Sequence, residues 1–279
     1  MRPTVLSIAG SDSSGGAGIQ ADLKSIEANG GYAATVLTGI TAQNTRGVER
    51  TSPLSPELVR AQVEAVFEDL RVVAVKSGML GEAVIVGELA RALDRYRPAY
   101  YVCDPVMFSS GGLQLLDDEG VEALRRLLLP RATLVTPNVR EAERLSGAEL
   151  RDSSQVERVG RLLLEAGARA VLVTGGHLSD RPATDFLVTA EACSVFPGEP
   201  VDTAHDHGSG CVYASAIATG LARGLGLRDA VGEAKRFVTE AIRHGLAIGA
   251  GSGPVDPFFG LESREARARR ETVECSEER

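Results

Sequence analysis

The 279-residue sequence contains no tryptophan, and aromatic residues of all kinds make up only 4% of the chain. Proteins that bind single-stranded nucleic acid stack bases on aromatic side chains. The formal net charge of -8 also opposes binding to a phosphate backbone. We therefore expect no nucleic acid partner, and any anionic ligand must be bound by local donors.

Cysteine is also scarce, and its spacing is uninformative. The four cysteines (Cys103, Cys193, Cys211 and Cys275) include no CxxC pair, which argues against a zinc site or a disulfide framework. The first apolar run is too short for a signal peptide, and no apolar stretch approaches the length of a membrane span. These absences predict a cytoplasmic protein with no membrane partner.

What the chain does contain is a regular alternation of short apolar runs with longer segments of helical spacing. The expected strands are residues 5–9, 33–40, 72–76, 100–104, 133–136 and 170–174, with a hairpin at 183–188 and 192–196. The expected helices are residues 18–29, 56–70, 83–95, 117–129, 153–166, 211–223 and 228–245. This alternation predicts an α/β fold with a mainly parallel central sheet covered by helices on both faces.

The sequence shows neither a linker nor an internal repeat, so we expect one domain over residues 1–261. Residues 262–279 are dense in charge and poor in core residues, which is typical of a solvated helix or a disordered tail.

Polar or glycine-rich loops follow six of the predicted strands. They comprise residues 10–18, 41–45, 77–80, 105–112, 137–141 and 175–177. The carboxyl ends of parallel strands meet at one edge of a sheet, which is where open α/β sheets bind ligands. The six loops are therefore expected to share one rim, and this rim is the candidate site.

The turn from Gly208 through Ser209 and Gly210 to Cys211 leads into an apolar helix. The first N–H groups of such a helix have no internal partners and attract anions. The pKa of a thiol at this position tends to fall. The turn predicts a phosphate site that contains a reactive group, although glycine turns and cysteines also serve ordinary packing.

Two further segments suit a small polar substrate. The loop 10–18 lacks a P-loop or Rossmann pattern, and Asp22 beyond it either turns inward or lies on a solvated helix face. The Gln43 amide offers one acceptor and two donors, which match the edge of an aminopyrimidine ring.

Asn138 and Glu141 are one helical turn apart and can face the same point. Their oxygens suit Mg²⁺, but the same spacing is typical of a capping box. His205 and His207 flank the glycine turn without metal-ligand spacing, so we place both at the surface. His177 either contacts a nucleotide or ends a strand.

Together these segments resemble one family in order and content. The residues that carry the resemblance are 10–24, 41–45, 76–80, 104–107, 136–141, 175–177 and 208–211. Over residues 4–259 the chain resembles hydroxymethylpyrimidine/phosphomethylpyrimidine kinase, the thiamin-pathway member of the ribokinase superfamily. The resemblance implies a ribokinase-like three-layer α/β/α fold, a homodimer, and the cofactors ATP and Mg²⁺.

The implied activity is phosphorylation of 4-amino-5-hydroxymethyl-2-methylpyrimidine and then of its monophosphate. Site residues follow position by position. The pyrimidine pocket would comprise Gly10, Asp22, Gln43, Met79 and Val106, and the metal side Asp104, Asn138 and Glu141. The nucleotide would lie along Thr174, Gly176 and His177. Cys211 would act as the general base, while the amides of Gly208, Ser209 and Gly210 hold the phosphoryl charge.

Some positions depart from the family pattern. Thr174 and the pair Ser109 and Ser110 stand where the family usually has lysines. Their absence removes cations that neutralise phosphate and bears on the second phosphorylation. Two alternatives stay open: a pyridoxal or pyridoxine kinase of the same branch, and a non-catalytic pyrimidine-binding protein.

Overall fold

The computed structural model describes residues 2–261, except 110, 176–177 and 179. Its centre is a nine-stranded sheet of order β3-β2-β1-β4-β5-β6-β7-β8-β9. The strands are β1 (Thr4–Asp12), β2 (Tyr32–Asn44), β3 (Gly47–Pro53), β4 (Val72–Ser77), β5 (Tyr100–Cys103), β6 (Leu134–Val135), β7 (Ala170–Val173), β8 (Asp185–Thr189) and β9 (Cys193–Phe196). The run from β2 to β7 is parallel, whereas β3, β8 and β9 are added antiparallel at the two edges.

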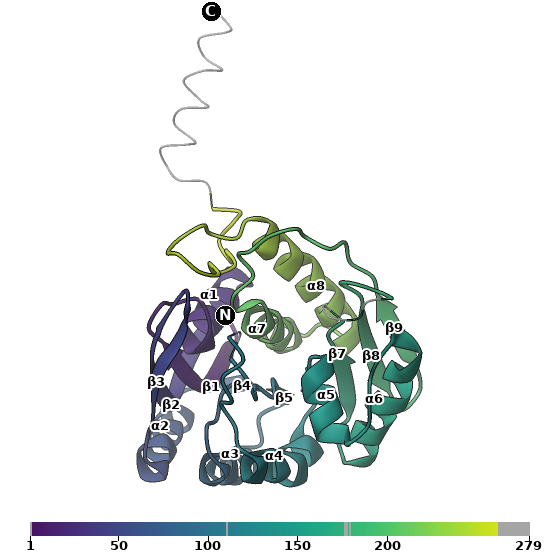
Figure 1. Cartoon of the computed structure of the whole chain (residues 1–279). Coiled ribbons are helices and arrows are strands. Elements are labelled where there is room, and N and C mark those ends of the chain that lie inside the picture. The colour runs from purple at the N-terminus through teal and green to yellow at the C-terminus, as the bar shows by residue number, and fades with distance from the viewer. Residues whose placement is uncertain (1, 110, 176–177, 179, 262–279) are drawn as a thin grey trace, which may run out of the picture.

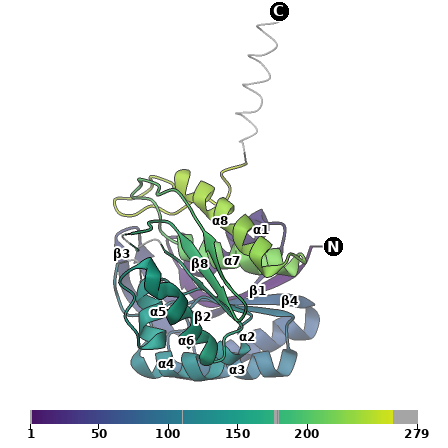
Figure 2. The ribbon, with the colours of Figure 1, turned by 90° about the vertical axis from the view of Figure 1, so that its right-hand side faces the viewer.

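Helices cover both faces of this sheet (Figures 1 and 2). One face packs against α2 (Pro56–Asp69), α3 (Ala83–Tyr96), α4 (Asp118–Ala123), α5 (Val139–Ser146) and α6 (Val156–Glu165). The other face packs against α1 (Gly18–Ala28), α7 (Ser209–Ala222) and α8 (Leu227–Arg243). The predicted three-layer α/β/α arrangement is confirmed. Among the described residues, no helix is long and apolar enough to cross a membrane.

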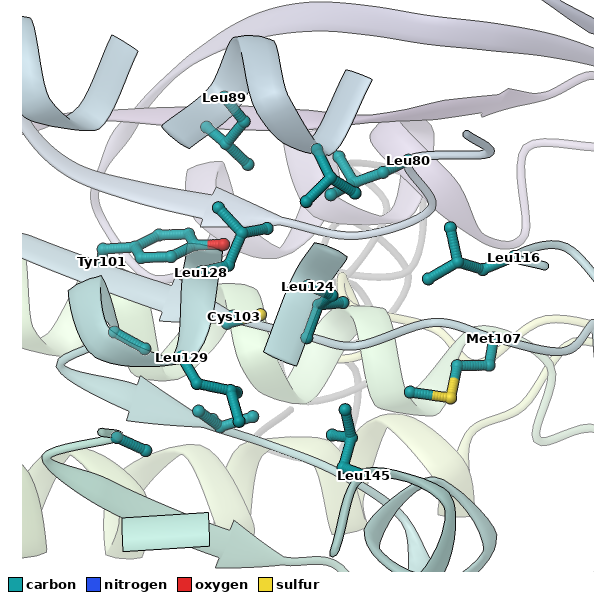
Figure 3. Packing of buried hydrophobic residues seen from close by; sticks show 14 of the residues in the cluster. Leu80, Leu89, Tyr101, Cys103, Met107, Leu116, Leu124, Leu128, Leu129 and Leu145 are labelled. Atoms are coloured by element: carbon teal, nitrogen blue, oxygen red, sulfur yellow. The ribbon is translucent and has the colours of Figure 1, made fainter. Parts of the chain in front are cut away.

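Two apolar clusters fill the spaces between the layers, and the larger one also anchors the strand-end loops. Figure 3 shows Leu80 and Met107, from the loops after β4 and β5, among the buried side chains of this cluster. Leu116, further along the second loop, is buried there as well. These loops are therefore fixed at one end by core packing, which lets them hold polar groups in place at the rim.

The six predicted parallel strands and the hairpin are all present, with their ends shifted by a few residues. The edge strand β3 was not predicted, because its side chains are mostly exposed and show no alternation of apolar and polar residues. Within the predicted helix 117–129, only Asp118–Ala123 is α-helical. A π-helical turn (Leu124–Leu128) and a 3-10 turn (Leu129–Arg131), which contains Pro130, follow it.

Candidate functional site

A cavity of about 660 Å³ lies where the parallel strands end, as predicted from the six loops. Twelve of the candidate residues line it: Gly10, Gln43, Met79, Asp104, Val106, Asn138, Glu141, Thr174, Gly208, Ser209, Gly210 and Cys211. Gly176, His177 and Ser110 fall outside the described residues. The volume is within the range of small-molecule sites.

The candidate that does not line the cavity is Asp22. Its carboxylate is fully buried behind the wall, and it accepts hydrogen bonds from the Ser7 hydroxyl at 2.6 Å and the Ser215 hydroxyl at 2.8 Å. Lys76 Nζ donates to the two carboxylate oxygens at 2.8 and 3.0 Å. The expectation that Asp22 contacts the pyrimidine is therefore corrected: this carboxylate holds Lys76.

Lys76 was missed as a site residue by the sequence reasoning. Its side chain is fully buried, and Nζ also lies 3.3 Å from Asp104 Oδ2. Burial opposes its charge, but the negative groups around it, Asp22 foremost, raise the pKa of Lys76 above its ordinary value. The available signal was a lysine that directly follows four apolar residues in a buried strand.

The glycine turn has the backbone geometry that an anion site needs. Gly208 has φ 81°, and a Cβ there would lie 1.8 Å from the Gly16 carbonyl oxygen, so only glycine fits. The first bond within α7 runs from Val212 N–H to the Gly208 carbonyl. The Gly210 and Cys211 amides precede it at the positive end of the helix.

The Ser209 amide differs from the expectation. It donates to the Asp206 carbonyl at 3.1 Å and is thus committed to the turn. The Ser209 N–H group predicted to bind an anion is therefore occupied within the protein.

The Cys211 thiol also departs from the prediction of a lowered pKa. Burial raises the pKa of Cys211 to about 12, and the opposing effect of Lys76 is outweighed. The acidic groups Asp22 and Asp104 add to the rise. The position at a helix N-terminus does not overcome burial and these two carboxylates, so the thiol is neutral at pH 7.

Asp12, which the sequence did not single out, organises the wall of the cavity after β1. Its carboxylate accepts from Ser14 N–H at 2.8 Å and Ala17 N–H at 2.8 Å, which folds the loop after β1. His207 Nε2 lies 3.1 Å from Asp12 Oδ2 and 3.2 Å from Gln43 Nε2. Burial opposes ionisation of Asp12, but its hydrogen bonds, that from His207 foremost, hold its pKa below the ordinary value.

The placement of His207 corrects the expectation that it lies at the surface. It is 7% exposed and links the Asp12 loop to the glycine turn that it precedes. His205 is half-buried, and its Nδ1 accepts from Gly253 N–H at 3.2 Å. At the neighbouring wall, a Cβ on Gly10 would lie 2.2 Å from Met79 Cε, so a larger residue would displace that side chain.

Asn138 and Glu141 form the capping box that their spacing allowed. Asn138 Oδ1 accepts from Glu141 N–H, and Glu141 Oε2 accepts from Asn138 N–H, each at 3.0 Å. Burial, helped by the negative charge of Asp104, raises the pKa of Glu141 to about 8. Burial likewise raises the pKa of Asp104.

The same groups fit a divalent cation. Asp104 Oδ2 is buried, with the Lys76 ammonium 3.3 Å away, and Asp104 and Glu141 both line the cavity. Mg²⁺ is usually held by one or two carboxylates together with phosphate oxygens and water. The described residues contain no group of three or more His, Cys, Asp or Glu arranged around a metal. A site of two carboxylates agrees with both points.

Comparison with known proteins places this geometry in context. A family model described as phosphomethylpyrimidine kinase matches residues 12–256. A hydroxymethylpyrimidine/phosphomethylpyrimidine kinase of Rhizobium meliloti is 46% identical over 261 residues, which cover 92% of this chain and 98% of that protein. A thiamine biosynthesis bifunctional protein (ThiED) of Geobacter sulfurreducens is also 46% identical, over 94% of this chain. The chain spans about half of that relative, 53% of its length.

A solved structure is similar over nearly the whole chain. The ADP complex of Bacillus subtilis pyridoxal kinase aligns with a TM-score of 0.86 and 36% sequence identity. The alignment covers 92% of this chain and 97% of that one.

The buried ion pair generates a stability prediction. Lys76→Met leaves Asp22 and Asp104 without their cation, and we expect a loss of about 3–5 kcal/mol in the free energy of unfolding. Arg161→Met, which breaks an exposed pair with Glu157, should cost less than about 1 kcal/mol. Urea unfolding of both variants measures this, and the double variant Lys76→Met/Asp22→Asn should recover part of the loss. A change below about 1 kcal/mol for Lys76→Met would contradict the role given to this lysine.

Glu141 generates a pH prediction. Its pKa is raised in the folded protein from 4.5 to about 8, so the folded state binds an extra proton and loses stability as pH rises through this window. Glu141→Gln carries no such charge, and its free energy of unfolding relative to the wild type should increase from pH 4.5 to 8 and then level off. Unfolding curves at several pH values test this, with Glu157→Gln as the exposed control. A difference that is independent of pH would show that Glu141 is ionised in the fold.

Proposed function

Because the chain belongs to the phosphomethylpyrimidine kinase family, we propose that it phosphorylates 4-amino-5-hydroxymethyl-2-methylpyrimidine and then its monophosphate, with ATP, in thiamine biosynthesis. The observation that carries the proposal is a single cavity lined by three sets of residues. They are the glycine turn, the acidic residues Asp104 and Glu141, and the proposed ring pocket of Gly10, Gln43 and Met79. The family resemblance also leads us to include a single kinase domain over residues 1–261 and a cytoplasmic homodimer.

The acceptor ring is placed by residues from the first strands of the parallel run. Gly10 and Met79 form an apolar wall. The Gln43 amide lies between the Thr41 hydroxyl, 3.0 Å from Gln43 Oε1, and His207 Nε2, 3.2 Å from Gln43 Nε2. An amide at this position suits the nitrogen-rich edge of an aminopyrimidine.

The transfer itself depends on charge stabilisation. The Gly210 and Cys211 amides offer N–H donors to the phosphoryl oxygens on which charge develops. Asp104 and Glu141 would hold Mg²⁺, which when bound supplies positive charge for those oxygens. Thr174 lines the cavity where we place the nucleotide.

The hydroxyl proton of the first step needs an acceptor, and Cys211 is the candidate. Its thiol is neutral at pH 7, and only the small thiolate fraction can take the proton, so its contribution should be smaller than that of a base with a tuned pKa. In the second step the nucleophile is a phosphate oxygen that is already ionised. Cys211 therefore matters more for the first step than for the second.

The direct test of the function is a time course with ATP, Mg²⁺ and the hydroxymethylpyrimidine, followed by ³¹P NMR. The proposal requires the monophosphate to appear and then the diphosphate. Binding of the pyrimidine without any ATP turnover would support the non-catalytic alternative instead. The similarity to a pyridoxal kinase structure supports pyridoxal as a second candidate substrate.

The role proposed for Cys211 predicts that its removal affects kcat of the two phosphorylations unequally. We expect Cys211→Ala to lower kcat of the first phosphorylation about tenfold, below the range of a full general base, and that of the second less than twofold. Cys193→Ala, on the edge strand β9, should leave both steps unchanged. Steady-state kinetics with each acceptor measures this. Equal losses in both steps would exclude a proton-accepting role for the sulfur.

A further inference from the structure

The described walls of the cavity carry an unequal distribution of charge. Five acidic residues contribute to them: Asp12, Asp104, Glu141, Glu143 and Asp206. Among the described lining residues, Arg140 is the only arginine or lysine. Lys76 lies behind the wall with its charge committed to two carboxylates. A phosphorylated acceptor entering this cavity therefore meets several carboxyl groups and one guanidinium.

Arg140 is positioned by the ring of Phe108, which lines the same cavity. Its Cζ lies 3.6 Å from the ring centroid, the distance of close stacking. None of the ion pairs in the described part of the chain involves Arg140. A guanidinium stacked on an aromatic face keeps its N–H groups free at the edge, where they match two phosphate oxygens.

Arg144, one turn further along α5, shows what is particular to Arg140. Its Cζ is 5.4 Å from the same ring, and its guanidinium is paired with Asp118. It does not line the main cavity. The two arginines share a helix and an aromatic neighbour, but of the two only Arg140 lines the main cavity, and Arg140 is exposed and takes part in none of the ion pairs of the described residues.

We propose that Arg140 binds the phosphate of the pyrimidine monophosphate and so admits this intermediate to the second phosphorylation. This inference rests on the proposed function. Phe108 and Arg140 line the same cavity as Gln43 and Met79 of the proposed acceptor pocket, so the guanidinium borders the space that the acceptor would enter. The unphosphorylated pyrimidine is neutral and has no need of this cation. The monophosphate is an anion that must approach Asp104 and Glu141.

Isothermal titration in the absence of nucleotide tests the inference without depending on turnover. The probes are the hydroxymethylpyrimidine and its monophosphate, titrated into wild-type protein, Arg140→Ala, Arg140→Lys and Arg144→Ala. We expect Arg140→Ala to raise Kd for the monophosphate at least tenfold and for the unphosphorylated ring less than twofold. Arg140→Lys should fall between, and Arg144→Ala should match the wild type. Phe108→Leu keeps the bulk but removes the stacking face, so it should weaken monophosphate binding in the same direction.

The outcomes separate this inference from the function on which it rests. Wild-type protein that binds neither pyrimidine would overturn both. Wild-type protein that binds both, with Arg140→Ala unchanged or equally weakened for the two, would overturn only the role of Arg140. A parallel titration with ATP adds a third arm, because a loss confined to ATP would assign the guanidinium to the nucleotide. Circular dichroism checks that each variant is folded.

Discussion

The site depends on a buried ammonium, that of Lys76, between the carboxylates of Asp22 and Asp104. These groups come from β4, α1 and the end of β5, so one ion cluster joins three elements that are distant in the sequence. A lysine is rarely buried without a partner, since an unpaired charge in a dry interior costs several kcal/mol. The cluster also acts on the chemistry. Burial, together with the negative members of the cluster, keeps the Cys211 thiol neutral, which limits its use as a proton acceptor.

Much of the fold was predictable because it depends on local pattern. Apolar runs of strand length between segments of helical spacing gave the parallel sheet, and the loops after the strands gave the location of the cavity. Asn138 and Glu141 illustrate the same point, since a capping box is defined by a spacing of three residues. The edge strand β3 escaped because its exposed side chains carry no pattern, and its pairing with β2 is set by tertiary structure.

What the sequence could not predict is the identity of each residue's neighbours. Asp22 was expected in the substrate pocket, but the serines on β1 and α7 and the ammonium on β4 enclose it. His207 was expected at the surface, but it is buried and forms a hydrogen bond with Asp12, which is 195 residues away in the sequence. The pKa of Cys211 follows the same rule: helix position argued for a low value, and burial near Asp22 and Asp104 determined a high one. Thr174 and Ser109 stand at positions where the family usually has lysines, whereas Arg140 supplies a cation to the lining of the cavity.

We propose that this cavity selects an aminopyrimidine as the acceptor. Competition tests this selectivity most directly, with the hydroxymethylpyrimidine and pyridoxal present together at equal concentration and ATP limiting. The ratio of the two phosphorylated products gives the ratio of the kcat/KM values. We expect the phosphorylated pyrimidine to be the predominant product. A predominance of pyridoxal phosphate would contradict this expectation and favour the pyridoxal kinase alternative.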